Sequence, residues 1–216
     1  MADNGAKPAL LLKEKAYREI HKAILHEIFR PGEFLSERRL IEYLGMSKTP
    51  IKSALDRLEA EGFVQVWPKQ GIVVKELSYD RIRDIFELRL ALELFVCELV
   101  SGKLRPEQAL EFERNLELQY KTAEAGDEAG FTQADSDFHI LLSRCSGNAE
   151  IHSVMKMYQD HLFRSALKVL KRVPNRMQAA YRDHLAIYEA LGAGETERAR
   201  QLMRDHLNFG KGILVE

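Results

Sequence analysis

The sequence predicts a mainly α-helical protein made of an N-terminal winged helix-turn-helix and a C-terminal all-α helical bundle. The first part is predicted by two short helical segments only three residues apart, followed by two β-branched runs around a Pro/Gly turn. The second part is predicted by helical periodicity that continues from about residue 79 onward without a strand pattern.

Helix start and stop signals delimit the predicted helix-turn-helix. A helix over 10–29 should stop at Pro31-Gly32, and a short helix should run from a cap at Ser36 to Leu44, with Gly45 as its end. Ser47 should cap the next helix, which tolerates Pro50 in its first turn and extends to about residue 61.

The segments 63–67 and 72–74 are rich in β-branched residues and are joined by Pro68-Lys69-Gln70-Gly71, so they predict a small hairpin. A hairpin directly after a helix-turn-helix is a wing. We therefore expect a winged helix-turn-helix over residues 10–75, after a disordered tail at 1–9. A linker over 76–79 should precede a helical domain over 80–216. Helical periods in that part cover 79–101, 106–124, 127–146, 148–171, 175–192 and 195–209.

Composition supports a folded chain with a slightly basic first part. Of its 216 residues, 45% are hydrophobic and 30% charged, which is enough apolar material for a core and excludes an intrinsically disordered chain. The net charge is −1, but residues 1–75 contain 13 Lys and Arg against 10 Asp and Glu. This excess favours the N-terminal part as the one that faces nucleic acid.

The sequence also indicates a cytoplasmic protein with no membrane partner. The first eight residues are polar and lack the apolar segment of a signal peptide, and no run approaches the roughly 20 apolar residues of a membrane span. Cys97 and Cys145 lie in apolar helical patterns, which is typical of buried, reduced thiols.

The second helix of the predicted helix-turn-helix has one apolar face and one polar face. Lys48, Thr49 and Lys52 lie opposite the apolar stripe, where they can reach DNA phosphates and base edges in the major groove. Arg38 is a candidate phosphate contact. Lys69 and Gln70 at the wing tip are candidates for an adjacent groove. The alternative interpretation is a solvated charged face on an ordinary helical hairpin.

A second group of residues has the spacing of metal ligands. Asp135 and His139 are four residues apart on one predicted helix, so they share a face. His184 and His206 lie on two later helices, and together the four could hold zinc or another first-row divalent ion. The alternative is that these are three of seven histidines with separate surface or structural roles.

The segments 31–40, 44–55 and 58–63 read PGEFLSERRL, LGMSKTPIKSAL and LEAEGF. They resemble the GntR family of bacterial regulators, whose pattern has Pro-Gly, Leu-x-Glu, Val-Ser-Arg-Thr-Pro-Val-Arg-x-Ala-Leu and Leu-Glu-x-x-Gly. The resemblance implies operator contacts at Arg38, Lys48 and Lys52, with Gly71 at the wing. The two lysines replace arginines of the family pattern and lack the planar fork that reads guanine, so the resemblance leaves the operator sequence open.

The second half resembles the FCD effector domain of the FadR-type subfamily. The residues that carry this resemblance are Glu87-Leu88-Arg89 with Glu93, Asp135-x-x-Phe138-His139 before Ser146-Gly147-Asn148, and the pair His184 and His206. The resemblance implies a divalent metal, zinc or else nickel or manganese, on Asp135, His139, His184 and His206. It also implies a small carboxylate or hydroxy acid held by the metal and by Arg89. The alternative for Arg89 is a helix-surface ion pair with Glu93.

These observations together predict a homodimeric transcription regulator, not an enzyme. It would bind a palindromic operator in double-stranded DNA and act as a repressor that a small organic acid releases. Two alternatives remain open, a regulator for which the metal itself is the signal and a metal-dependent enzyme. The sequence contains no recognisable nucleophile motif to support the enzyme.

Overall fold

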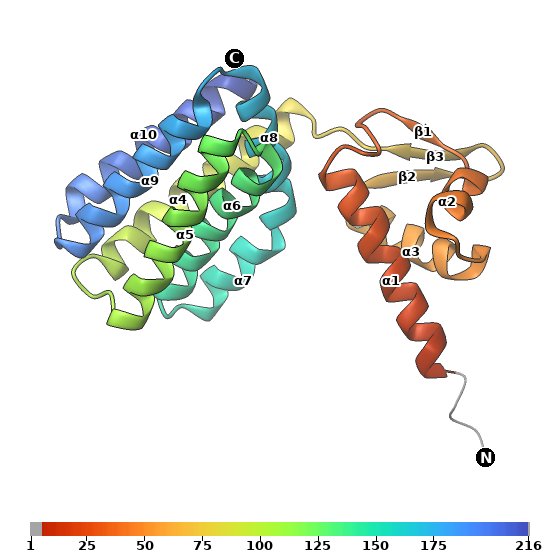
Figure 1. The fold of residues 1–216 in the computed structure, drawn as a ribbon, viewed down its shortest axis with the longest axis horizontal. Helices are drawn as coiled ribbons and strands as arrows, with labels where there is room; N and C mark the ends of the chain where they lie inside the picture. The colour runs from red at the N-terminus through yellow and green to blue at the C-terminus, as the bar shows by residue number, and fades with distance from the viewer. Residues whose placement is uncertain (1–5, 216) are drawn as a thin grey trace. The chain divides into compact units, whose positions relative to one another are not determined.

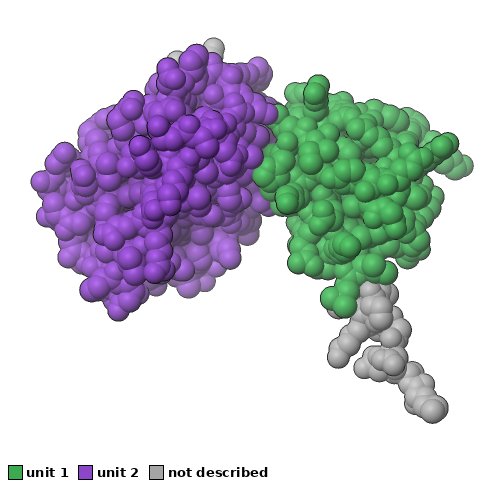
Figure 2. Space-filling view, in the orientation of Figure 1, with its two compact units in different colours: residues 1–76 green, residues 77–216 purple. Residues whose placement is uncertain are grey.

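The computed structural model describes residues 6–215, and the chain divides into two compact units. Unit 1 comprises residues 1–76 and unit 2 residues 77–216 (Figure 2). The mainly α-helical class is confirmed, with one small sheet in unit 1 and a bundle of helices in unit 2 (Figure 1). Among residues 6–215, no helix combines the length and the apolar character needed to cross a membrane.

Unit 1 has the three helices and the hairpin in the order that the sequence predicts, with one additional short strand before α2. Its helices are α1 (Ala6–Leu25), α2 (Glu37–Leu44) and α3 (Lys48–Ala60), and its strands are β1 (Phe34–Leu35), β2 (Val64–Trp67) and β3 (Gly71–Val74). The Ser36 side chain accepts a hydrogen bond from the Arg39 amide at the start of α2, and Gly45 ends that helix with φ +62°. Helix α2 is therefore bounded by a capping serine at its start and a glycine at its end. Ser47 occupies the N-cap position of α3, as the sequence predicts, but its side chain forms no capping hydrogen bond.

The hydrophobic core of unit 1 lies between α1, α3 and the sheet. Ile20 and Ile24 of α1 pack with Ile51 and Leu58 of α3 in one buried cluster, which holds the recognition helix on the domain. The sheet is antiparallel with the order β1-β3-β2, so the hairpin gains a third strand from the segment before α2.

Two details of unit 1 differ from the prediction. The first helix ends at Leu25 instead of residue 29, because Glu27 has a left-handed backbone (φ +56°) and the chain folds back so that the Phe29 amide bonds to Ala23. The expected tail at 1–9 overlaps α1 at residues 6–9, and residues 1–5 lie outside the described part of the chain.

Unit 2 consists of α4 (Tyr79–Val100), α5 (Pro106–Ala125), α6 (Glu128–Cys145), α7 (Ala149–Met157), α8 (Gln159–Arg172), α9 (Arg176–Gly192) and α10 (Thr196–Val215). Helix α10 packs along both α4 and α9, and α6 packs between α5 and α8 (Figure 1). Phe112, Phe138 and Ile187 are fully buried where these helices meet. The bundle therefore surrounds α6 on several sides.

One feature of unit 2 corrects the prediction. The single helix expected over 148–171 is divided into α7 and α8 at Tyr158, whose φ of −96° and ψ of 1° leave the helical range. On α4, Phe95 is 47% exposed. Cys97 and Cys145 are free thiols, the first buried and the second half-buried.

The wing depends on a glycine at its turn. Gly71 has φ +142°, and a β-carbon built there would lie 2.2 Å from the Phe34 ring and 2.9 Å from the Leu35 carbonyl oxygen. We expect Gly71→Ala to lower the free energy of unfolding of unit 1 by about 2–4 kcal/mol, because backbone strain and overpacking act together. Urea unfolding of the full chain, followed by the fluorescence of the single Trp67 in β2, measures this change.

Gly45→Ala is the matched control, because Gly45 also has a positive φ but has open space around the added methyl group. That variant should lose only about 1 kcal/mol. Equal losses in the two variants would contradict a close contact between Gly71 and β1.

Candidate functional site

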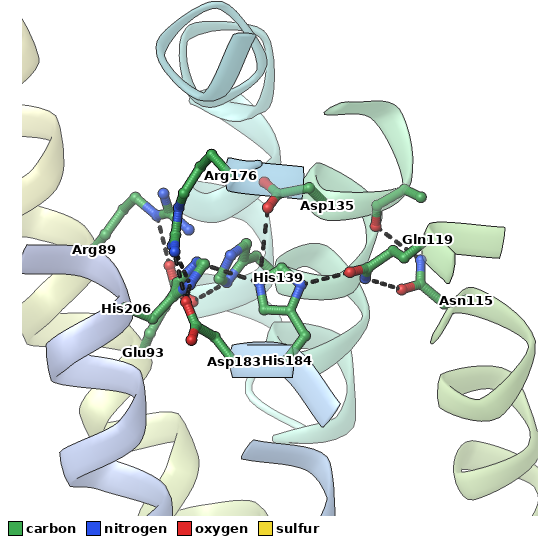
Figure 3. A network of polar contacts seen from close by, with 11 residues as sticks. Arg89, Glu93, Asn115, Gln119, Asp135, His139, Arg176, Asp183, His184 and His206 are labelled. Atoms are coloured by element: carbon green, nitrogen blue, oxygen red, sulfur yellow. Dashed lines mark hydrogen bonds and ion pairs between the residues drawn. The ribbon is translucent and has the colours of Figure 1, made fainter. Parts of the chain in front are cut away.

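The structure brings the four predicted metal ligands together in the centre of unit 2. Asp135 and His139 come from α6, His184 from α9 and His206 from α10 (Figure 3). One ligand atom of each side chain lies within 4.8 Å of those of the other three. The spacing of four residues on α6 therefore does place both side chains on the face that meets α9 and α10.

Packing inside the bundle fixes the positions of the imidazole rings. The Phe138 ring stacks on the His184 ring with centroids 4.3 Å apart, and His139 and His184 meet edge to face. His139 and His184 have almost no exposed surface. Because protein interiors are densely packed, the buried rings have few alternative positions.

Each histidine has its Nδ1 atom engaged by a different acceptor. His139 bonds to Glu93 Oε2 of α4 at 2.5 Å, His184 to Gln119 Oε1 of α5 at 2.8 Å, and His206 to Asp183 Oδ2 of α9 at 3.2 Å. Arg176 Nη2 also lies 3.3 Å from His206 Nδ1. An imidazole that donates from Nδ1 presents its other nitrogen, Nε2, as a lone pair. Donation from Nδ1 would leave the Nε2 lone pairs of His139 and His184 available to a cation, and the Nε2 atoms of His184 and His206 face each other at 3.2 Å.

The acceptor of His184 is itself oriented by a chain of hydrogen bonds. Gln119 Nε2 donates to Asn115 Oδ1 at 2.7 Å, and Asn115 Nδ2 donates to the Ala134 carbonyl at 2.9 Å (Figure 3). Since the amide nitrogen of Gln119 is used in this chain, its oxygen faces His184. The backbone of α6 thus fixes the tautomer of a ring on α9.

Burial dominates the electrostatics of the cluster. It lowers the pKa of His184 well below its ordinary value, with His206 and His139 adding to the effect, and it lowers the pKa of His139 and of His206 as well. Burial alone would raise the pKa of Glu93, but Arg89 and His139 bring it down to about 2. Neutral imidazoles are the protonation state that metal binding requires. Burial raises the pKa of the ligand carboxyl of Asp135, and a bound cation would oppose that rise.

The residues present fit a divalent metal ion. His139 Nε2 is buried and has no hydrogen-bond partner, which is unfavourable unless a cation or another group binds there. The Nε2 atoms of His184 and His206 are 3.2 Å apart, close to the about 3.4 Å that separates two nitrogens bound tetrahedrally to zinc. A carboxylate oxygen of Asp135 and a ring nitrogen of His139 complete a donor set of one oxygen and three nitrogens.

Arg89 lies beside the cluster and is buried, whereas an arginine on a helix surface would be exposed. Its Nε donates to Glu93 Oε1 at 2.7 Å, so the predicted alternative ion pair is present, but both side chains are buried. Arg89 also lines a cavity of about 40 Å³, together with Asp135, Arg176 and His206. The ion pair and a place at the cavity wall are therefore compatible.

The predicted DNA-contacting residues of unit 1 are all exposed except Gly71, which is half-buried in the wing. Lys48, Lys69, Gln70 and Gly71 line one groove of about 320 Å³ between the start of α3 and the wing. Arg38, Thr49 and Lys52 lie outside this groove. Lys48 forms an ion pair with Glu37 at 2.6 Å and Arg38 with Glu42 at 2.8 Å, and both pairs are exposed.

Sequence reasoning missed several residues that hold the centre together. Gln119, Asp183 and Arg176 were not identified, and Glu93 was noted only as a partner for Arg89. Asp183 adjoins His184 in the chain but forms its hydrogen bond with His206, because neighbouring residues on a helix point in different directions. No spacing rule identifies Gln119, which is 65 residues from its partner.

Two family profiles match this chain and together cover most of it. Residues 12–74 match the bacterial regulatory proteins of the gntR family, and residues 84–209 match the FCD domain. The two matched segments fall within unit 1 and unit 2 respectively.

Curated relatives extend over nearly the full length. A transcriptional regulator in an unstable DNA locus of Streptomyces ambofaciens is 32% identical over 192 residues, covering 88% of this chain and 80% of the relative. The transcriptional repressor RspR of Escherichia coli is 24% identical and covers 93% of this chain and 87% of its own. Among solved structures, E. coli McbR/YncC aligns with a TM-score of 0.78 at 22% identity, covering 94% of this chain and 96% of that one.

Removing the acceptor of His139 should weaken metal binding. We expect Glu93→Gln to reduce the zinc affinity of the full chain about 10–100-fold, because the amide loses the negative charge that orients the ring and makes it a better ligand. A competition titration with a chromogenic chelator measures this affinity.

Glu87→Gln is the matched control, since Glu87 lies on the same helix but is exposed and pairs with Lys211. It should bind zinc as the wild type does. If Glu93→Gln also bound zinc with unchanged affinity, the orienting role of Glu93 would be wrong.

Proposed function

Since this chain belongs to the GntR family of bacterial regulators and carries an FCD domain, we propose that it is a repressor released by a small organic acid. The acid would bind at the metal-ligand cluster of unit 2, and unit 1 would bind DNA. The observation that carries the proposal is the buried group of one aspartate and three histidines beside an arginine-lined cavity, in the same chain as a winged helix-turn-helix. The cytoplasm, where bacterial DNA lies, is the proposed location.

Asp135, His139, His184 and His206 would hold the metal, and zinc suits three nitrogens and one oxygen, with nickel or manganese as alternatives. A bound divalent ion would supply positive charge and open coordination positions for an acid. The chain itself positions the three rings through Glu93, Gln119 and Asp183 and buries the centre.

DNA binding is proposed for the exposed residues of α2, α3 and the wing. Lys48, Thr49 and Lys52 lie at the start and first turns of α3, the part of a recognition helix that enters the major groove. Arg38 would contact phosphate, and Lys69 and Gln70 would reach an adjacent groove, with Gly71 shaping the wing. The exposed ion pairs of Lys48 and Arg38 contribute little stability, so both cations can exchange carboxylate for phosphate.

A homodimer on a palindromic operator is the proposed assembly. Leu88, Leu92, Phe95 and Leu99 form an apolar stripe on α4, and none of the four is buried. Their spacing of four, three and four residues is that of a two-helix seam, which a second copy of α4 would complement. Relatives support repression more than activation, since RspR is named a repressor.

DNA binding in the presence of organic acids tests the proposed function. We expect the zinc-loaded protein to bind a duplex selected from a random library, and one of a panel of carboxylates and hydroxy acids to weaken that binding about 5–150-fold. Fluorescence anisotropy of the labelled duplex measures the affinity. Lys52→Ala should bind this duplex less tightly at every acid concentration, whereas Lys13→Ala on the exposed part of α1 should not.

The controls separate the rival functions. Chelation that changes DNA affinity without any acid would make the metal the signal. Turnover of a bound acid would indicate an enzyme, although the relatives described above are named as regulators. The proposal fails if no acid in the panel changes DNA affinity in the zinc-loaded protein.

The α4 stripe should control assembly. We expect Phe95→Glu to convert the dimer to a monomer, because a charge in an apolar seam must be buried without a partner or leave the interface. Sedimentation equilibrium at micromolar protein measures the mass. Leu118→Glu, on an equally exposed leucine of α5, should leave the mass unchanged. A dimeric Phe95→Glu protein would place the interface elsewhere.

A further inference from the structure

Unit 2 contains a second, polar cleft on a different face of α6 from the metal-ligand cluster. Helix α6 packs against both α5 and α7 (Figure 1), and all three helices contribute residues to a cleft of about 440 Å³. Along each helix the lining residues are three, four or seven positions apart, which is the spacing of side chains on one face. Three helix faces therefore converge on this space.

The cleft contains cationic side chains that the protein leaves unpaired. Arg114 on α5 and Lys156 on α7 are exposed, and neither forms a hydrogen bond or an ion pair with any residue in the described part of the chain. A third cation, Arg144 on α6, pairs with Glu111 on α5. Cations that line a concave surface attract anions more strongly than scattered surface charges do, because low-dielectric walls focus their field.

His152 on α7 lies in the same positive field. Its partial burial, together with the charges of Lys156 and Arg144, lowers its pKa. The Ser143 hydroxyl donates to the Ile140 carbonyl at 2.7 Å, so its oxygen accepts from His152 Nδ1 at 3.0 Å. Nε2 is therefore the atom that gains a proton when the ring becomes charged. An anion bound in the cleft would favour that charged form.

The arrangement of the cations favours a phosphate group over a carboxylate. Arg114, Arg144 and Lys156 come from three different helices, so their N–H groups approach the cleft from three walls. A phosphate ester offers three strong acceptor oxygens and between one and two negative charges near neutral pH, and its tetrahedral shape can receive donors from several directions. A carboxylate has two oxygens in one plane and a single charge.

The remaining lining indicates the organic part of such a ligand. Ile140 and Leu141 give the cleft an apolar portion on α6. Asp137 Oδ1 accepts from Gln133 at 2.9 Å and from Gln159 at 3.2 Å, which leaves Oδ2 available to a hydroxyl group. The cleft lies within the roughly 300–1,000 Å³ of small-molecule sites and exceeds what a phosphate ion alone would fill.

We propose that the cleft between α5, α6 and α7 binds a small organic phosphate whose body carries hydroxyl groups. Arg114, Arg144 and Lys156 would bind the phosphoryl oxygens, and Asp137 would accept from a hydroxyl group. The ligand belongs to a different chemical class from the acid proposed for the metal-ligand cluster, and its binding does not depend on that acid. Asn115 lines the cleft and also belongs to the chain of hydrogen bonds that orients His184, so the two sites share one supporting residue.

Isothermal titration calorimetry of the full-length protein tests this inference, with glucose 6-phosphate as the probe. We expect glucose, glucuronate and inorganic phosphate each to bind at least about ten-fold more weakly than glucose 6-phosphate. Glucose lacks the anion, glucuronate replaces the phosphate with a carboxylate, and inorganic phosphate lacks the hydroxylated body. Arg114→Gln and Lys156→Gln should each weaken the binding of glucose 6-phosphate about ten-fold or more.

The titration of His152 gives a second measurement at the cleft itself. Glucose 6-phosphate should raise the pKa of His152, because the bound phosphate opposes the effect of Lys156 and Arg144. Nuclear magnetic resonance of the histidine rings measures this pKa, with the His152 signal assigned by its loss in His152→Asn. Phosphate bound at the metal-ligand cluster instead would leave the titration of His152 unchanged.

Arg198→Gln is the matched control, since it removes the same charge from an exposed arginine of α10 that does not line the cleft. It should bind glucose 6-phosphate as the wild type does. Arg114 and Lys156 are exposed, so their variants should fold, and circular dichroism checks this.

The inference would be overturned by a wild type that does not bind glucose 6-phosphate, or that binds any of the three comparison compounds equally well. Unchanged binding by both Arg114→Gln and Lys156→Gln, or an unchanged pKa of His152, would also overturn it. None of these outcomes affects the proposed function, which the DNA and zinc titrations described above test separately.

Discussion

Three imidazole rings lie in the interior of unit 2, and the need to give each of them a hydrogen-bond partner constrains the whole bundle. A buried polar atom without a partner costs about 1–3 kcal/mol. The three acceptors come from three different helices, Glu93 on α4, Gln119 on α5 and Asp183 on α9. With the ligands on α6, α9 and α10, one polar centre fixes the relative positions of five helices, and shifting any of them would leave a buried ring unpaired.

Unit 1 follows the opposite principle, since the side chains proposed to contact DNA are exposed and weakly paired. Lys48 and Arg38 each have a carboxylate partner at the surface, where solvent screens the attraction. Such pairs position the long side chains without binding them tightly. In the proposed complex a DNA phosphate would replace the carboxylate at little cost, and release of counterions from the duplex would supply much of the affinity. Rigid packing in this unit is confined to the core between α1, α3 and the sheet.

The sequence predicted what depends on local patterns. The bounds of α2 follow from Ser36 and Gly45, and the pairing of Asp135 with His139 follows from a spacing of four residues. The sequence did not predict β1, because two residues are too few to show a pattern. It also did not predict the division between α7 and α8 at Tyr158, because neither glycine nor proline marks that break. The partners of the histidines were also missed, since they depend on which helices pack together, and Arg176 reaches the cavity only through the fold.

Any response to a ligand must pass through elements that the ligand favours in one arrangement over another. Helix α4 is the element best placed to transmit such a preference. It carries Arg89 and Glu93, which are paired beside His139, and only the short segment 75–78 separates it in the chain from β3 of the wing. It also carries the apolar stripe that includes Phe95. In the proposed function, an acid bound beside Arg89 would act on the helix that carries both part of the metal-ligand surroundings and the proposed dimer seam and that continues directly from unit 1 in the chain, so a small shift of α4 would affect all three together.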